Sequence, residues 1–125
     1  MEDRNMKNPL YLQTKMENIR RYSHDALFQF PKKERYLLCR QIEDCIERII
    51  REVIRFQKRY YKKNTLQEID IELEFLRGLI REAREESYIS NGRLADWMGH
   101  VDEAGKILGG LLKFYQEKEA GRSGK

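Results

Sequence analysis

Residues 38–60, LCRQIEDCIERIIREVIRFQKRY, contain the apolar repeat that decides the fold. Apolar side chains recur along this stretch at steps of three or four residues: Leu38, Ile42, Cys45, Ile49, Val53, Phe56 and Tyr60. This spacing matches the helical period and predicts a long amphipathic helix with one buried face. Ile46, Ile50 and Ile54 widen that face, and the period outweighs the strand preference of such β-branched residues.

Further helices are expected on both sides of this one. Asn8 offers an N-cap and Pro9 a first-turn proline, so the first helix should run from Pro9 to Leu27. It should stop before Pro31, because the residue ahead of a proline is pushed out of the α region. The helix quoted above should then occupy about residues 33–62.

The second half of the chain predicts two more helices. Thr65 opens a T-L-Q-E capping box, which places the third helix at about residues 66–86. Ser90 should cap a fourth helix at about residues 91–118, followed by a flexible tail over 119–125. No strand pattern competes, so we expect a single all-α domain, an up-down-up-down antiparallel four-helix bundle.

Composition limits the classes of protein to consider. The 125-residue chain is 37% charged and 40% apolar, as in a helical protein with much exposed surface. No apolar run approaches the roughly 20 residues that span a bilayer, so we expect a cytoplasmic protein. Cys39 and Cys45 lie on different sides of one predicted helix and should be free, buried thiols.

Candidates for catalysis or metal binding are few. His24 and His100 are the only histidines, and neither has a second His or Cys three or four residues away. A solvated surface position is therefore the expectation for both. The Glu-x-x-His motif of di-iron bundles is missing, and the terminal GRSGK lacks the spacing of a phosphate-binding loop. The sequence predicts no catalytic residue, metal or cofactor, and an enzyme would need a recruited metal or a partner's residues.

Positive charge is concentrated in one segment of the chain. Residues 31–63 carry eleven basic and five acidic groups, a net +6, whereas the whole chain nets +4. On a helical wheel six of these basic residues fall within an arc of about 100°. This set is the basic stripe: Arg48, Arg51, Arg55, Lys58, Arg59 and Lys62. Beyond Glu52 no acid follows until Glu68, which favours contact with a polyanion over a merely solvated face.

The chemistry of the basic stripe suits phosphates, because Lys and Arg neutralise a nucleic-acid backbone without reading its sequence. Lys63 continues the stripe along the chain. The predicted third helix adds three arginines to the candidate set: Arg77, Arg81 and Arg84. Pairing with Glu74 or Glu85 is an equal alternative for these three. An acidic protein is the other kind of partner that the stripe would suit.

The predicted third helix carries a second apolar seam, formed by Ile71, Phe75 and Leu79. A monomeric bundle needs only one such seam per helix, so we expect the second to face another subunit. Gly105 and Gly109 lie one turn apart in the fourth helix, where each costs about 1 kcal/mol relative to alanine. Their spacing predicts the close approach of another backbone, in a tight helix or subunit contact.

Three stretches are similar to a known family: FPKKERYLLCRQIEDCIERIIREVI, LQEIDIELEFLRGLIREARE and VDEAGKILGGLLK. They resemble the four-helix accessory variability proteins, Avd, of diversity-generating retroelements over about residues 10–115. The closest marks are Phe30-Pro31-Lys32, Leu76-Arg77, Ile80-Arg81 and Ile107-Leu108-Gly109-Gly110. Leu111 departs from the pattern, since members often have an aromatic residue there. Four-helix proteins encoded by intervening sequences in bacterial 23S ribosomal RNA genes share much of this pattern.

The resemblance implies an assembly and a role. Five subunits would form a barrel, a homopentamer that binds the retroelement's reverse transcriptase and its template RNA, or the RNA/DNA hybrid. The protein would support mutagenic reverse transcription without performing chemistry, and would need neither a membrane nor a small-molecule substrate. The alternative is a structural or protein-interaction bundle of the 23S type with no specific nucleic-acid role.

Overall fold

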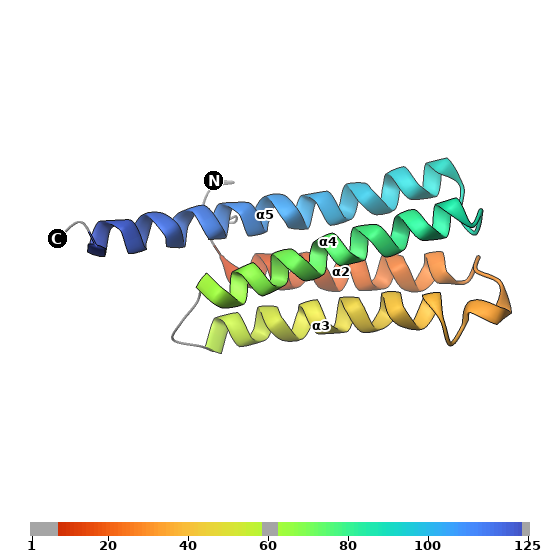
Figure 1. Ribbon diagram of the computed structural model, residues 1–125, viewed down its shortest axis with the longest axis horizontal. Coiled ribbons are helices and arrows are strands. Elements are labelled where there is room, and N and C mark those ends of the chain that lie inside the picture. Colours follow the sequence, from red (N-terminus) through yellow and green to blue (C-terminus); the bar gives the residue numbers. More distant parts are fainter. Residues whose placement is uncertain (1–7, 59–62, 124–125) are drawn as a thin grey trace.

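The structure is a computed structural model that describes residues 8–58 and 63–123, with side chains over 8–58 and 64–118. The described elements are all helical (Figure 1): α2 (Pro9–Leu27), the 3₁₀ turn η1 (Lys32–Glu34), α3 (Leu38–Lys58), α4 (Lys63–Glu85) and α5 (Asn91–Ser123). None of these described helices is both long and apolar enough to cross a membrane.

The four long helices lie side by side, and consecutive helices run in opposite directions (Figure 1). Each helix contacts two neighbours: α3 packs on α2 and α4, and α5 packs on α4 and α2. The apolar faces of all four helices meet in one core, where the Phe56 ring of α3 also reaches the Tyr115 ring of the diagonal helix α5, at a centroid distance of 5.5 Å. The predicted all-α fold with four helices is confirmed.

The core is made by the faces that the apolar periods predict, except that Ile54, expected to widen the buried face of α3, is 40% exposed. α3 buries nine side chains: Leu38, Cys39, Ile42, Cys45, Ile46, Ile49, Ile50, Val53 and Phe56. Both cysteines are free, as expected. Trp97 of α5 is fully buried, and its indole N–H donates to the buried Ser23 hydroxyl of α2 at 2.8 Å. This bond satisfies two polar groups that would otherwise destabilise the core.

The predicted boundaries of the first helix agree with the structure, but the predicted start of the second does not. α2 has the predicted bounds, and the Asn8 side chain caps it by accepting from the Leu10 N–H at 2.9 Å. The expected start of the second helix at residue 33 is wrong. Pro31 is extended and η1 follows it, so α3 begins only at Leu38, whose N–H donates to the Glu34 carboxylate at 3.2 Å.

The third helix also begins earlier than its capping box predicts. α4 starts at Lys63, so Thr65 lies inside the helix with its side chain buried rather than at the N-cap. The end of the predicted second helix falls within residues 59–62, outside the described residues. The side chain of Lys63 is likewise outside the described side chains.

The fourth helix begins as predicted, because the Ser90 hydroxyl accepts from the Arg93 N–H at 3.0 Å. α5 continues to Ser123. Residues 119–123, expected as a flexible tail, are therefore helical. This end of α5 extends past the ends of the other helices (Figure 1).

A left-handed residue closes α4. Ser87 has φ 64° and is the only described non-glycine residue with positive φ. The N–H of Tyr88 donates to the Ala83 carbonyl and that of Ser87 to the Arg84 carbonyl, both at 2.9 Å. These two bonds form a Schellman motif, in which glycine is the preferred residue at the left-handed position.

Tyr88 then ties the two connections at this end of the bundle together. Its hydroxyl donates to the Glu34 carboxylate at 2.7 Å, and its ring packs on Phe30 at a centroid distance of 5.5 Å. The hydrogen bond from Tyr88, followed by that from the Leu38 N–H, lowers the pKa of Glu34. The same carboxylate raises the pKa of Tyr88 to about 12. The Glu34 carboxylate thus caps the start of α3 and, through Tyr88, anchors the α4–α5 connection.

Ser87→Gly should stabilise the fold by about 0.5–1 kcal/mol, because glycine adopts a left-handed conformation without steric penalty. The free energy of unfolding measured in urea checks this. Ser90→Gly is the matched control and should destabilise slightly, since it removes a cap. A destabilised Ser87→Gly protein would contradict the Schellman assignment.

Tyr88→Phe should destabilise the protein near neutral pH and much less in acid. The folded-state pKa of Glu34 lies below its ordinary value of 4.5, so its contribution is present above pH 4.5 and is lost as the pH falls through the folded value. The difference in unfolding free energy between wild type and variant should therefore narrow below about pH 4.5. Tyr36→Phe, at an exposed ring, is the control. A difference that does not change with pH would show that Glu34 is not involved.

Candidate nucleic-acid interface

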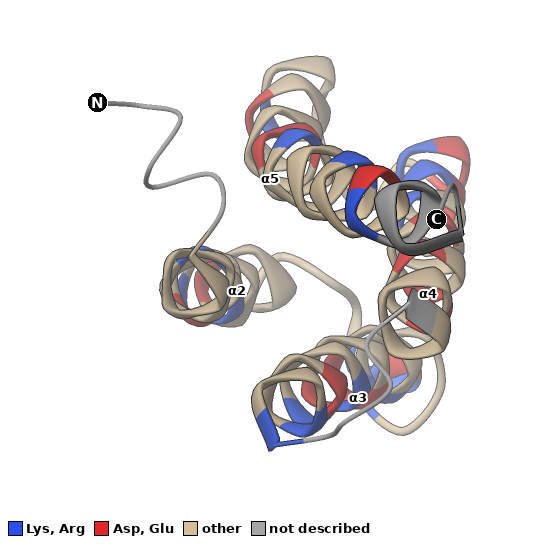
Figure 2. Cartoon of the chain, turned by 90° about the vertical axis from the view of Figure 1, so that its left-hand side faces the viewer, with Lys and Arg blue, Asp and Glu red and all other residues tan. Residues whose placement is uncertain are grey.

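The described part of the basic stripe follows the exposed face of α3. Its members there are Arg48, Arg51, Arg55 and Lys58, all exposed. The Lys and Arg positions near the C-terminal end of α3 face away from the other helices (Figure 2). Arg59 and Lys62 lie outside the described residues. The one-sided arrangement predicted from the helical wheel is therefore present over the described length of the helix.

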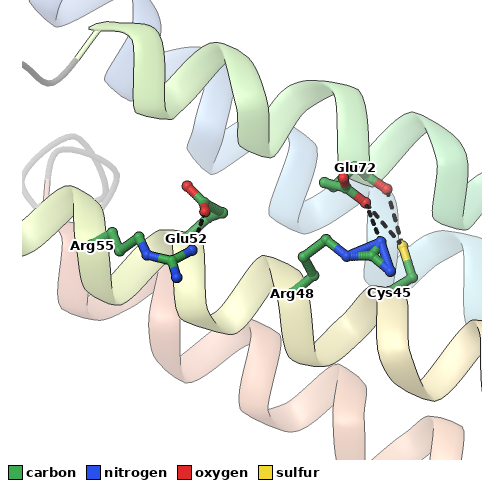
Figure 3. Close-up of polar contacts among 5 residues, drawn as sticks. All are labelled: Cys45, Arg48, Glu52, Arg55 and Glu72. Atoms are coloured by element: carbon green, nitrogen blue, oxygen red, sulfur yellow. Dashed lines mark hydrogen bonds and ion pairs between the residues drawn. The ribbon is translucent and has the colours of Figure 1, made fainter.

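Two members of the stripe are paired within the chain (Figure 3). The guanidinium of Arg48 reaches α4, where it lies 3.3 Å from the Glu72 carboxylate. Arg55 pairs with Glu52 on its own helix. The Arg48–Glu72 contact joins residues that are 24 positions apart, so the wheel of a single helix could not reveal it. Pairing lowers the positive charge that these two arginines offer to a partner.

The other two described members of the stripe, Arg51 and Lys58, are not ion-paired with any described residue. Within the described side chains, no carboxylate lies within ion-pair distance of Arg51 or Lys58. An exposed cation without an acid beside it has no intramolecular partner to give up when a phosphate approaches. Arg51 and Lys58 are thus the strongest described candidates for contact with a polyanion.

Arg77 does not join the basic stripe. Its guanidinium lies between α4 and α5, 3.1 Å from both the Glu74 and the Asp102 carboxylates. A Cβ at position 105 would lie 2.6 Å from Arg77 Nη2, so Gly105 leaves room for this guanidinium. The expectation that Gly105 admits another backbone is wrong within this chain, because a side chain occupies that space.

Arg81 and Arg84 are also engaged within the chain. Arg81 lies 3.7 Å from the Glu74 carboxylate, and Arg84 donates to the Asn91 side-chain oxygen at 2.6 Å. Glu72 is the α4 residue that contacts the stripe, through Arg48. At 100° per residue, the three arginines of α4 lie about 120–180° around the helix from Glu72. The structure therefore separates these three arginines from the stripe.

The predicted second seam of α4 is only partly exposed. Ile71 and Phe75 are 66% and 52% exposed, whereas Leu79 is 5% exposed and belongs to the core. Ile71 and Phe75 line a shallow groove of about 670 Å³ on the outer side of α4. Apart from its chain neighbours and its own helix backbone, no described atom lies within 4 Å of a Cβ placed on Gly109, so no other described part of the chain approaches that glycine.

The cysteines and histidines have structural surroundings. Cys45 is buried beside Glu72 (Figure 3), and burial followed by that carboxylate raises the pKa of its thiol to about 12, which makes it a poor nucleophile. His24 is exposed, while His100 is partly buried with its ring 4.8 Å from that of Tyr22. Among the described residues, no group of three or more His, Cys, Asp or Glu side chains could hold a metal ion.

Comparison with known proteins places the chain in a family. The sequence model of the bAvd-like family matches residues 10–115. The chain belongs to the bAvd-like family. No curated protein and no solved structure matches it. For this bAvd-like protein the match covers α2, α3, α4 and most of α5, and therefore includes the described part of the stripe.

One further surface of the bAvd-like protein was not predicted. A pocket of about 640 Å³ lies between the end of α2 and the start of α3. Its lining is formed by His24, Leu27, Phe28, Phe30, Pro31, Lys32, Arg35, Cys39 and Glu43. The sequence signal that could have found it is Phe28, a large apolar lining residue that belongs to no core stripe.

Proposed function

We propose that this chain is the accessory variability protein of a diversity-generating retroelement. It binds the element's reverse transcriptase and template RNA, supports mutagenic copying of the template, and leaves the chemistry to the polymerase. The observation that carries this proposal is the bAvd-like family match over residues 10–115. The resemblance described from the sequence supplies the partners.

The charge distribution of α3 supports RNA as a partner. Arg51 and Lys58 are exposed and have no carboxylate within ion-pair distance among the described side chains. Both lie on the helix face that also carries Arg48 and Arg55. Such a surface attracts the phosphate backbone and releases its counterions, with little discrimination between sequences.

A homopentamer is the assembly that we propose for the protein. The exposed Ile71 and Phe75 support an additional contact, because they form an apolar groove on α4 that this chain leaves uncovered. Burying these two side chains against a second subunit would remove apolar surface from water. The number of five subunits comes from the family resemblance alone.

A structural bundle of the 23S type is the second candidate function. The pairing of Arg48, Arg55 and Arg77 within the chain favours it, because paired arginines attract a polyanion less strongly. The neighbouring DNA distinguishes the two candidates. A reverse-transcriptase gene beside an imperfect repeat pair supports the retroelement role, and a location inside a ribosomal RNA gene supports the structural one.

The double variant Arg51→Glu with Lys58→Glu should weaken binding of the template RNA and reduce its salt dependence. Each lost phosphate contact flattens the slope of log affinity against log salt by about 0.7–0.9, so two contacts should flatten it by about 1.4–1.8. Filter binding of the template RNA between about 50 and 200 mM salt measures both effects.

Lys106→Glu with Lys113→Glu is the matched control for this experiment. Both lysines are exposed on α5, and their reversal changes the net charge by the same amount. The control should bind RNA with nearly the wild-type slope. Equal loss in the two double variants would mean that only net charge matters, and an unchanged slope in the stripe variant would refute the interface.

Ile71→Asp with Phe75→Asp should convert the pentamer to monomers that remain folded. Both side chains are exposed in the single chain, so a carboxylate there harms the subunit contact and not the core. Light scattering coupled to size exclusion should give about five times the 15.1 kDa chain mass for wild type and about one for the variant.

Leu10→Asp is the control for this substitution, because Leu10 is a similarly exposed leucine on a different helix. It should leave the mass unchanged. Gly109→Ala tests the glycine separately, since a Cβ there meets no described atom outside its own helix, and interference by the alanine would therefore indicate contact with another molecule. Wild-type protein that is monomeric at micromolar concentration would contradict the oligomer.

A further inference from the structure

The pocket between α2 and α3 combines an apolar floor with a charged rim. Its floor is formed by Leu27, Phe30, Pro31 and Cys39, and its volume is about 640 Å³. That volume lies within the range of pockets that accept one large side chain or a small ligand. The connection between α2 and α3, and therefore the pocket, lies at the opposite end of the bundle from the end of α3 (Figure 1).

Large apolar side chains around this pocket face solvent. Phe28, which lines it, is 78% exposed. Tyr36 and Leu37 do not line the pocket, but they follow its lining residue Arg35 in the chain and are 76% and 60% exposed. Exposed apolar side chains contribute little to the stability of the fold, because they remove little apolar surface from water. Their concentration within ten residues of chain marks a surface that another molecule covers.

The charge around the pocket is predominantly positive. Lys32 and Arg35 lie in its rim and Lys33 lies between them, and none of the three has a carboxylate partner within the described side chains. Among the described residues of the lining, Glu43 is the one carboxylate.

The neighbouring acids are already engaged. Asp25 pairs with Arg93, and Asp44 with Arg40. Glu34 accepts from both Tyr88 and the Leu38 N–H. The rim therefore has cations available for an acidic partner, in addition to an apolar floor.

We propose that this pocket docks an acidic segment of a protein partner. A large apolar side chain of that segment enters the pocket against Phe30 and Leu27, while flanking carboxylates pair with Lys32 and Arg35. The apolar floor suits a large apolar side chain, and the cations Lys32 and Arg35 suit the carboxylates that flank it. A nucleobase stacked on Phe28 is the competing occupant that the crosslinking experiment below tests.

The pocket and the basic stripe are separate surfaces. At 100° per residue, Cys39 and Glu43 lie about 180° and 140° around α3 from Arg48. Lys58 lies about 28 Å along the helix axis from Cys39. A protein partner in the pocket and a polyanion on the stripe can therefore bind at the same time. The inference rests on the proposed function, because that function names the reverse transcriptase as the protein partner whose binding to the pocket is tested.

Photo-crosslinking identifies the occupant directly. Phe28→p-benzoylphenylalanine keeps an aromatic group in the lining and is irradiated in the full-length protein mixed with the reverse transcriptase and template RNA. We expect a crosslink to a polymerase segment that is rich in Asp and Glu and carries a large apolar residue. The same substitution at Phe75 is the control, and it should crosslink to a second copy of this chain.

The alternative outcomes overturn the inference. A crosslink from position 28 to RNA, to a second copy, or to a basic polymerase segment gives the pocket a different occupant. A complex that forms without any crosslink from position 28 removes the pocket from the interface and leaves the proposed function intact. A wild-type chain that does not bind the polymerase overturns the proposed function together with the inference.

Two charge variants test the rim in opposite directions. Lys32→Glu with Arg35→Glu should weaken binding of the reverse transcriptase by about tenfold or more, without changing the affinity for template RNA alone. Glu43→Gln removes the one repulsive carboxylate and should tighten polymerase binding about two- to fivefold. Misfolding cannot produce tighter binding, so the second variant separates charge from stability. Unchanged affinity in both variants would refute the charge complementarity.

Discussion

Burial of the apolar stripe of α3 against α2 and α4 is the constraint on which the other features depend. Nine of its side chains enter the core, so the rotation of α3 about its axis is fixed. Once that face is inside, Arg51 and Lys58 have no position other than the solvent side. The charged surface is thus a consequence of the packing of the core.

The chain uses its arginines in two different ways. Arg77 is held by Glu74 and Asp102 over Gly105, where it joins α4 to α5 as a structural element. Arg51 keeps its charge available on the surface. Both side chains are arginines on amphipathic helices, so residue type does not explain why one is paired and the other is free for a partner. Their positions in the bundle do, because carboxylates lie beside Arg77, whereas no described carboxylate lies beside Arg51.

Most of the fold follows from local sequence, because periodicity and capping operate within one helix. α2 and the Ser90 cap were predicted correctly for that reason. The start of α3 was not, since the turn after Pro31 and the capping carboxylate of Glu34 shift it by several residues. Thr65 matched a capping motif, yet its burial places it inside α4.

The candidate site was less predictable, because it depends on contacts between helices. The Glu72 partner of Arg48 and the Asp102 partner of Arg77 come from other helices, so no single-helix pattern contains them. Leu79 shares the spacing of Ile71 but turns into the core. The pocket at the start of α3 was missed because its lining comes from two helices and their connection.

The position of the Arg77 guanidinium against Gly105 has a consequence for the alignment of α4 with α5. Sliding α5 by four residues would bring Gly109 beneath the guanidinium, and this second glycine would admit it equally well. The same slide would replace Asp102 with Lys106, so an attraction would become a repulsion between like charges. The Asp102 partner of Arg77 therefore favours the observed alignment, in the same direction as the Trp97–Ser23 hydrogen bond that the slide would break.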